Sequence, residues 1–200
     1  MSEVCGSANR IAGSSFSIYP MSDRFVEIIK SSLNEVDTSK VWMRTDDVTT
    51  TVRGQMIHVF DVTKAIFLQA AKTGEHVVFQ ATYSIGCPGD SAGDVYMAED
   101  NLVQNASASG LIDQEAAAKF SLYPMGGGNY MDVIYGQIED MKNQGVEVSA
   151  AHYSTRLDGD GNRVFDGLEK VFQQTEEQGS PHTVMTVTIS ANSPSVKGGK

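Results

Sequence analysis

Cysteine is scarce in this 200-residue chain, which contains only Cys5 and Cys87. Neither has a second cysteine two to four positions away, so the spacing excludes a zinc knuckle and a thioredoxin-like redox motif. We therefore predict two free thiols.

Basic residues and long apolar runs are also scarce. The chain has 15 Lys and Arg residues against 25 Asp and Glu residues, and its formal net charge of −10 opposes binding to nucleic acid or to an anionic membrane surface. No segment approaches the roughly 20 apolar residues of a membrane span, and the first residues lack the basic segment and apolar run of a secretory signal. These absences predict a cytoplasmic protein that does not insert into membranes.

Motifs for catalysis or metal binding are missing as well. No two histidines form a His-x-x-x-His pair; the four are His58, His76, His152 and His182. Two of them, His76 and His182, open equivalent strands of the repeat described below, which favours a role in a turn or in packing. The sequence thus predicts no catalytic residue, no metal site and no cofactor.

Two segments come close to known motifs. Gly126–Gly128 lies between a predicted strand and a predicted helix, as a phosphate-binding loop would, but no Lys-Ser or Lys-Thr follows it. The segment from Asp158 to Glu169 has the acidic spacing of an EF-hand loop, but Arg163 takes the place of the glycine that the loop requires. We interpret the first as a flexible turn and the second as an N-capping turn, with calcium binding as the alternative for the second.

The chain does contain an internal repeat. The segment Phe-Ser-Ile-Tyr-Pro-Met at 16–21 returns as Phe-Ser-Leu-Tyr-Pro-Met at 120–125. Val-Phe-Asp at 59–61 returns at 164–166, and the segment 77–88 aligns with 183–194. Three matches in the same order, with offsets that differ by only two residues, indicate two copies of one structural unit.

Within each copy the hydrophobic period changes in the order strand, helix, strand, strand, helix, strand. In the first copy we predict strands over 14–19, 41–44, 48–53 and 77–84. A first helix begins near Ser22, a plausible N-cap, with apolar residues at helical spacing: Phe25, Val26, Ile29, Leu33 and Val36. The second helix carries a similar stripe in both copies: Val59, Val62, Ile66 and Ala70, then Val164, Phe165, Leu168, Val171 and Phe172. Gly74 and Gly179 mark its end.

This order predicts an α+β protein of tandem ferredoxin-like (βαββαβ) repeats, each an antiparallel four-stranded sheet with helices on one face. We place the first half-domain at 10–90, a surface linker at 91–115 and the second half-domain at 116–195. Each half is expected to have its own core. Serine, threonine and tyrosine dominate the open sheet faces, so we expect two halves or two subunits to meet through those faces.

Strand three carries an unusual hydroxyl. If Val48 and Val52 point toward the helices, Thr50 lies between them in the apolar register, and Thr155 takes the same place between Tyr153 and Leu157. Threonine is a good strand former, so an ordinary structural role is one interpretation. The other is a polar group inside a mostly apolar ligand pocket.

Several longer segments resemble the YkoF family of hydroxymethylpyrimidine- and thiamine-binding proteins. They are Ser-Ile-Tyr-Pro-Met (17–21), Thr-Ser-Lys-Val-Trp (38–42), Val-Phe-Asp (59–61), Ser-Ile-Gly-Cys-Pro-Gly-Asp (84–90) and Ser-Ala-Asn-Ser-Pro-Ser (190–195). The resemblance covers nearly the whole chain. It implies a homodimer, one thiamine site in each half, and a part in salvage or uptake of the pyrimidine, with a transporter component as a candidate partner.

The family pattern has a serine on strand one and a hydroxyl on strand three. Six residues become candidates for ligand binding, three in each half: Ser17, Asp47 and Thr50, then Ser121, His152 and Thr155. A hydroxyl can donate to or accept from an aminopyrimidine. The acidic surface near Asp46 and Asp47 favours binding of the positively charged thiazolium. The function predicted is non-catalytic binding, and the alternatives are a ligand-sensing regulatory module and an enzyme of thiamine metabolism.

Overall fold

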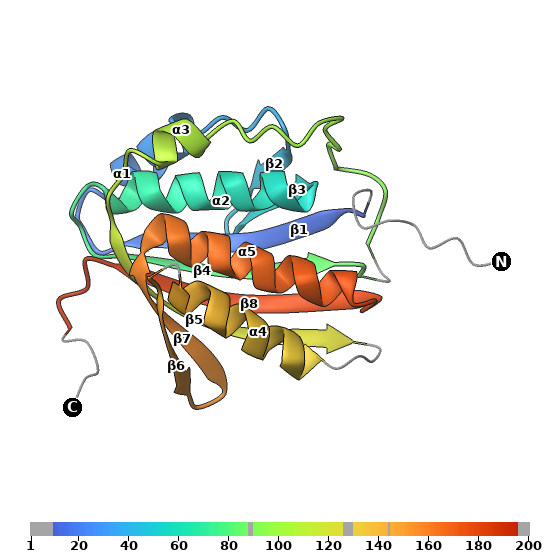
Figure 1. The fold of residues 1–200 in the computed structure, drawn as a ribbon. Coiled ribbons are helices and arrows are strands. Elements are labelled where there is room, and N and C mark those ends of the chain that lie inside the picture. The colour runs from blue at the N-terminus through green and yellow to red at the C-terminus, as the bar shows by residue number, and fades with distance from the viewer. Residues whose placement is uncertain (1–9, 88–89, 126–129, 144, 196–200) are drawn as a thin grey trace.

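The computed structural model describes residues 10–87, 90–125, 130–143 and 145–195, and its elements follow the predicted order (Figure 1). The first half contains β1 (Ala12–Pro20), α1 (Phe25–Asn34), β2 (Trp42–Thr45), β3 (Thr50–Gly54), α2 (Met56–Ala71) and β4 (Val77–Ile85). After a short helix α3 (Ala106–Ser109), the second half contains β5 (Glu115–Met125), α4 (Tyr130–Asn143), β6 (Glu147–Ala151), β7 (Ser154–Asp160), α5 (Gly161–Glu177) and β8 (His182–Ala191). The α+β class and the tandem βαββαβ units are confirmed.

The two halves join through strand edges rather than through sheet faces. Strands β4 and β8 pair antiparallel along nine residues, from Val77 opposite Ala191 to Ile85 opposite Thr183. The result is one eight-stranded sheet in the order β2-β3-β1-β4-β8-β5-β7-β6. The two four-stranded sheets are therefore continuous, because each of these long edge strands satisfies the backbone hydrogen bonds of the other.

One hydrophobic core runs under both halves, so the expectation of separate cores is wrong. Helices α2 and α5 lie side by side on the same face of the sheet (Figure 1). The ring of Phe165 lies 5.7 Å from that of Phe67 and 5.9 Å from that of Phe79, both of which belong to the first half. Phe60 likewise contacts Phe172, with the ring centroids 6.0 Å apart.

The side chains of His76 and His182 form hydrogen bonds across the junction of β4 and β8. Nε2 of His76 lies 3.1 Å from Oγ of Ser190, and Nε2 of His182 lies 3.2 Å from Oγ of Ser84. Each hydrogen bond crosses from one half to the other, so the predicted packing role of these repeat partners is confirmed.

The apolar stripes are confirmed for α2 and α5, but only in part for α1, where Leu33 packs against the core. Helix α1 begins at Phe25 with Arg24 as its N-cap, and the side chain of Ser22 accepts only a local hydrogen bond from the Arg24 N–H. The helix buries Ile28 and Ser32, while Phe25 and Val26 are about half exposed. Ser22 is therefore not the helix cap, and the helix has rotated its first apolar residues toward the surface.

Two further predictions concern turns. Asp160 caps α5 by accepting a hydrogen bond from the Arg163 N–H at 3.1 Å, as the N-capping interpretation predicted. Gly74 and Gly179 follow their helices with positive φ angles of 80° and 89°, which suit glycine. Gly126–Gly128 and Cys5 lie outside the described residues, and Cys87 is a free, exposed thiol.

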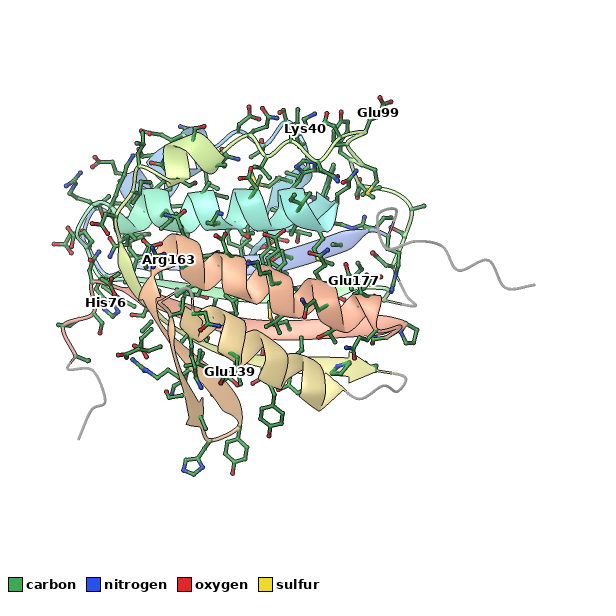
Figure 2. All side chains as sticks on the ribbon, in the orientation of Figure 1. Lys40, His76, Glu99, Glu139, Arg163 and Glu177 are labelled. Atoms are coloured by element: carbon green, nitrogen blue, oxygen red, sulfur yellow. The ribbon has the colours of Figure 1, made fainter. Side chains whose placement is uncertain are left out.

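The segment after β4 is bound to the first half-domain rather than lying loosely on it. Oδ2 of Asp61 accepts hydrogen bonds from the Gln104 N–H (3.2 Å) and from the backbone and side chain of Asn105 (3.1 and 2.8 Å). Lys40 pairs with Asp100 at 2.7 Å, on the side of the molecule where Lys40 and Glu99 are labelled in Figure 2. Residues 99–109 thus form a strap over α2.

We expect Asp61→Ala to lower the free energy of unfolding by about 3 kcal/mol, because three donors lose a buried charged acceptor. The matched control is its repeat partner, Asp166→Ala, which removes a half-exposed salt bridge to Lys64 and should cost about 1 kcal/mol or less. Urea unfolding measures both. Equal costs would show that the strap is not anchored through Asp61.

No helix among the described residues has both the length and the apolar character needed to cross a membrane.

Candidate functional site

A cavity of about 470 Å³ opens at one end of the first half-domain, between β1, α1 and the turn that joins β2 to β3. Its lining is mostly apolar, with a few hydroxyls and one carboxylate: Phe16, Ser17, Ile18, Tyr19, Pro20, Met21, Phe25, Ile29, Thr45, Asp46, Val48, Thr49 and Thr50. An apolar wall with few polar groups is typical of a site for a small organic molecule.

Hydrogen bonds fix the turn against strand one. Oγ of Ser17 donates to the carbonyl of Val48 at 3.2 Å, and Oγ of Ser15 donates to Oγ1 of Thr49 at 3.0 Å. Val48 lies in this turn and is 75% exposed, so, contrary to expectation, it is not packed beneath the helices. The strand-one serine acts by holding the turn that closes the cavity.

Thr50 is buried at the start of β3, as the apolar register predicted. Its Oγ1 lies 2.9 Å from Oγ1 of Thr45 on the neighbouring strand. A hydroxyl pair has one hydrogen to share across that contact and a second hydrogen to donate elsewhere. The pair can therefore present both a donor and an acceptor to a ligand in the cavity.

Asp46 supplies the negative charge of this site. Its Oδ1 accepts hydrogen bonds from the N–H groups of Val48 and Thr49 at 2.8 and 2.9 Å. These backbone hydrogen bonds lower the pKa of the Asp46 carboxyl below its usual value, and the one from Thr49 has the largest effect. The cavity mouth therefore carries an ionised carboxylate, which favours a cationic ligand. Asp47 is exposed beside it and does not line the cavity.

An equivalent cavity of about 490 Å³ lies in the second half-domain, between α4 and the β6–β7 hairpin. Its lining is more polar: Tyr135, Ile138, Glu139, Lys142, Val148, Ser149, Ala150, Ser154 and Thr155. Oγ of Ser121 donates to the carbonyl of Tyr153 at 2.7 Å, which repeats the contact of Ser17 with the first turn. In both halves, therefore, the serine of the first strand holds the turn of the neighbouring hairpin.

The two cavities differ at the polar positions. Thr155 is half-buried and pairs across the strands with Ala150, so the hydroxyl pair of the first half is absent. Ala151 takes the place of Asp46 in the repeat, and His152 takes that of Asp47. His152 and Tyr153 are exposed at the hairpin tip, and their rings lie 6.4 Å apart. Contrary to expectation, Tyr153 thus does not pack against the helices.

Three of the six predicted residues line one of the two cavities. Ser17 and Thr50 line the first cavity and Thr155 lines the second, whereas Asp47 and His152 lie at the hairpin tips outside either lining. Ser121 instead lines a groove of about 240 Å³ on the open face of the sheet.

Sequence reasoning missed the apolar wall of the first cavity. Tyr19, Met21 and Phe25 are each 46–58% exposed, and all three surround its opening with Val48. Clustered exposed apolar side chains are a mark of a binding surface. The signal was present in the sequence as Met21 and Phe25 on either side of a polar turn, but helical spacing assigned Phe25 to the core.

Comparison with known proteins agrees with the repeat. The model of the YKOF-related family matches residues 11–90 and again residues 115–196. The whole chain is 47% identical to a protein of Bacillus subtilis (strain 168) named "Putative HMP/thiamine-binding protein YkoF", over 99% of that protein's length. The crystal structure of protein SP2199 from Streptococcus pneumoniae matches 38% of this chain and 83% of its own, with 18% identity and a TM-score of 0.33, too low to support an argument.

Proposed function

We propose, from the premise that this chain belongs to the YKOF-related family, that it binds thiamine or its hydroxymethylpyrimidine part and leaves the ligand chemically unchanged. The observation that carries this proposal is the first cavity, which combines an apolar wall, the Thr45–Thr50 hydroxyl pair and the ionised Asp46. The name of the Bacillus subtilis relative supports the ligand class.

The chemistry of thiamine fits these three features. Its aminopyrimidine has a ring nitrogen that accepts and an amine that donates, which a pair of hydroxyls can satisfy in both roles. Its thiazolium is cationic and is attracted to the Asp46 carboxylate, while the flat ring faces suit the side chains of Tyr19 and Phe25. We place this binding in the cytoplasm, in salvage or transport of thiamine precursors.

Calorimetric titration tests the proposal with thiamine, hydroxymethylpyrimidine and the thiazole alcohol as ligands. We expect thiamine and hydroxymethylpyrimidine to bind and the thiazole alcohol, which lacks the pyrimidine, to bind at least tenfold more weakly. Chromatography after incubation should return thiamine intact. A cleaved or phosphorylated product would contradict a purely binding role, and failure of both pyrimidine ligands to bind would contradict the proposal itself.

We also propose that two copies of the chain associate through the open face of the sheet. The groove on that face is lined by polar side chains of β4, β5 and β8, among them Thr82, Lys119, Thr186 and Thr188, and none of the described helices covers it. Light scattering should report about 43 kDa, twice the 21.6 kDa of one chain.

Thr186→Arg places a bulky second cation diagonally opposite Lys119 on this face and should yield the monomer, because unpaired like charges are costly in a buried interface. Ser31→Arg, on the exposed side of α1, is the control and should remain a dimer. A wild-type monomer, or a Thr186→Arg dimer, would rule out association through this face.

A further inference from the structure

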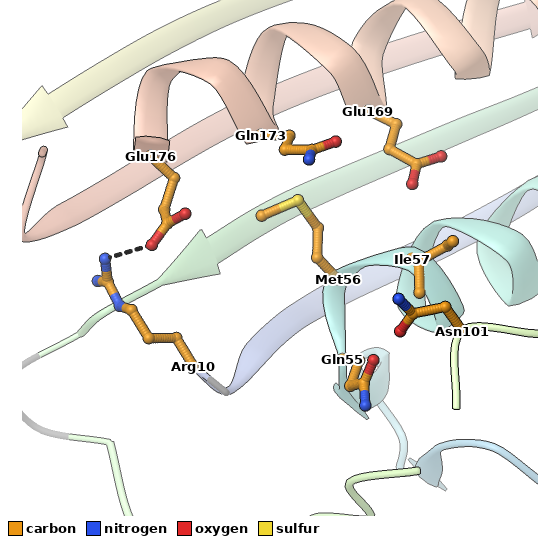
Figure 3. A pocket seen from close by; sticks show the side chains of 8 residues that line it. All are labelled: Arg10, Gln55, Met56, Ile57, Asn101, Glu169, Gln173 and Glu176. Carbon is orange, nitrogen blue, oxygen red and sulfur yellow. Dashed lines mark hydrogen bonds and ion pairs between the residues drawn. The ribbon is translucent and has the colours of Figure 1, made fainter. Parts of the chain in front are cut away.

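A third cavity lies on the helical side of the protein, between the first turn of α2 and the C-terminal half of α5. Its volume is about 180 Å³. Figure 3 shows Glu169, Gln173 and Glu176 projecting from successive turns of α5 toward the start of α2. The side-chain amides of Gln55 and Asn101 complete a lining rich in oxygen atoms. None of these five residues lines either of the proposed thiamine cavities.

Glu176 leaves one oxygen atom without a partner in this cavity wall. Its side chain is only 3% exposed, and Oε1 pairs with Arg10 at 2.7 Å. Oε2 is buried and has no hydrogen-bond partner among the described residues. In Figure 3 it points away from Arg10, toward the end of the Met56 side chain. A buried carboxylate oxygen without a donor is costly, so a donor brought by a ligand would be stabilising here.

Glu169 is a second carboxyl group without a donor. No described residue gives it a hydrogen bond, and burial raises the pKa of this carboxyl to about 7. The charged groups that act on it through space are Lys64 and Asp61 from α2, and Asp166 and Lys170 from its own helix. Across the cavity, the Arg10 charge is already offset by Glu176. A cationic ligand would therefore meet no unpaired positive charge from Arg10 at this site.

We propose that this cavity binds the ammonium group of a small primary amine, with Glu169 as its counter-ion and with the oxygens of Glu176, Gln173 and Asn101 as further acceptors. Three observations select this chemistry. The lining presents two carboxylates against one cation, which disfavours an anion. The described residues include no group of three or more His, Cys, Asp or Glu that could hold a metal ion. The volume admits a ligand of up to about eight heavy atoms, since a cavity of roughly 150 Å³ holds benzene.

Titration at pH 8 with ethanolamine and with 1,4-diaminobutane tests the proposal, with sodium acetate and calcium chloride as comparison probes. We expect saturable binding of at least one amine with a Kd of about 1 mM or tighter. NMR signals of residues 55–57 and 169–176 should shift. Glu169→Gln should weaken binding at least tenfold, while Glu115→Gln, the same change at an exposed position outside the lining, should leave it unaltered. Saturating thiamine should not compete.

The pH dependence gives a readout that a merely structural carboxyl would not produce. Amine binding requires the ionised form of Glu169, so affinity should rise roughly tenfold from pH 6 to pH 8 in the wild type and stay flat in Glu169→Gln. Because the folded-state pKa lies above the ordinary glutamate value of about 4.5, the carboxyl favours folding below about pH 4.5 and this contribution is lost as the pH rises through 7. Glu169→Gln should therefore be at least as stable as the wild type at pH 8, which ensures a folded test protein.

Three results would overturn the proposal. One is unaltered amine affinity in Glu169→Gln, and another is binding of acetate or calcium with no binding of either amine. The third is the absence of any amine binding at about 50 mM. None of these results bears on thiamine, whose proposed sites are elsewhere.

Discussion

Phe165→Ala should lower the free energy of unfolding by about 3–5 kcal/mol, and it should do so for both halves at once. Phe165 is 1% exposed and contacts rings from the other half-domain, so the cavity left by its removal opens in the shared core. The only tryptophan, Trp42, lies on β2 in the first half and serves as a local reporter. In urea, the Trp42 fluorescence transition and the far-ultraviolet circular dichroism transition should move to lower concentration together.

Leu111→Ala is the control for this experiment. Leu111 is 88% exposed, and its truncation should change stability by less than about 0.5 kcal/mol. If the halves instead unfold independently, Phe165→Ala would leave the Trp42 midpoint at its wild-type value while the circular dichroism transition splits into two. That outcome would refute the shared core as a cooperative unit.

Thr50→Val should weaken one of two thiamine sites by about 5- to 150-fold, which corresponds to about 1–3 kcal/mol, and leave the other unchanged. Valine preserves the shape of the side chain but removes the hydroxyl that lines the first cavity, so a polar group of the ligand is left unpaired. Thr155→Val should do the converse in the second cavity. A two-site calorimetric titration of both variants measures the effect.

The neighbouring residue provides the matched control. Thr51 lies on the same strand and its side chain points to the opposite face, so Thr51→Val makes the same chemical change outside the cavity. Thr50→Val also loses the hydrogen bond to Thr45, which should cost folding about 1 kcal/mol. If Thr50→Val and Thr155→Val both retain two unaltered affinities, these hydroxyls are ordinary strand residues and the proposed sites are wrong.

Side-chain periodicity predicted the features that depend on which side chains are buried. The stripes of α2 and α5 and the burial of Thr50 follow from the period of apolar residues, and the predicted family is confirmed. The junction of the halves was not predictable in this way. Strands β4 and β8 pair through backbone groups, and backbone groups leave no mark in the order of side chains.

The candidate site was predictable only at positions where the same residue type recurs in both copies of the repeat. Thr50 and Thr155 were recognised because the same hydroxyl recurs in an apolar register. The cavity wall was missed because an apolar residue that lines a cavity has the same helical spacing as one that faces the core, as Phe25 illustrates. Only the three-dimensional placement of α1 distinguishes the two.

The antiparallel pairing of β4 with β8 bears on how such a chain could arise. The two strands are equivalent in the repeat, so two identical copies of a half-length protein could form the same junction with each other as separate molecules. In such an ancestor the junction would exist only at a sufficient protein concentration. Duplication and fusion of the gene would make the contact intramolecular and independent of dilution, and each copy would then be free to diverge in the polar residues of its own cavity.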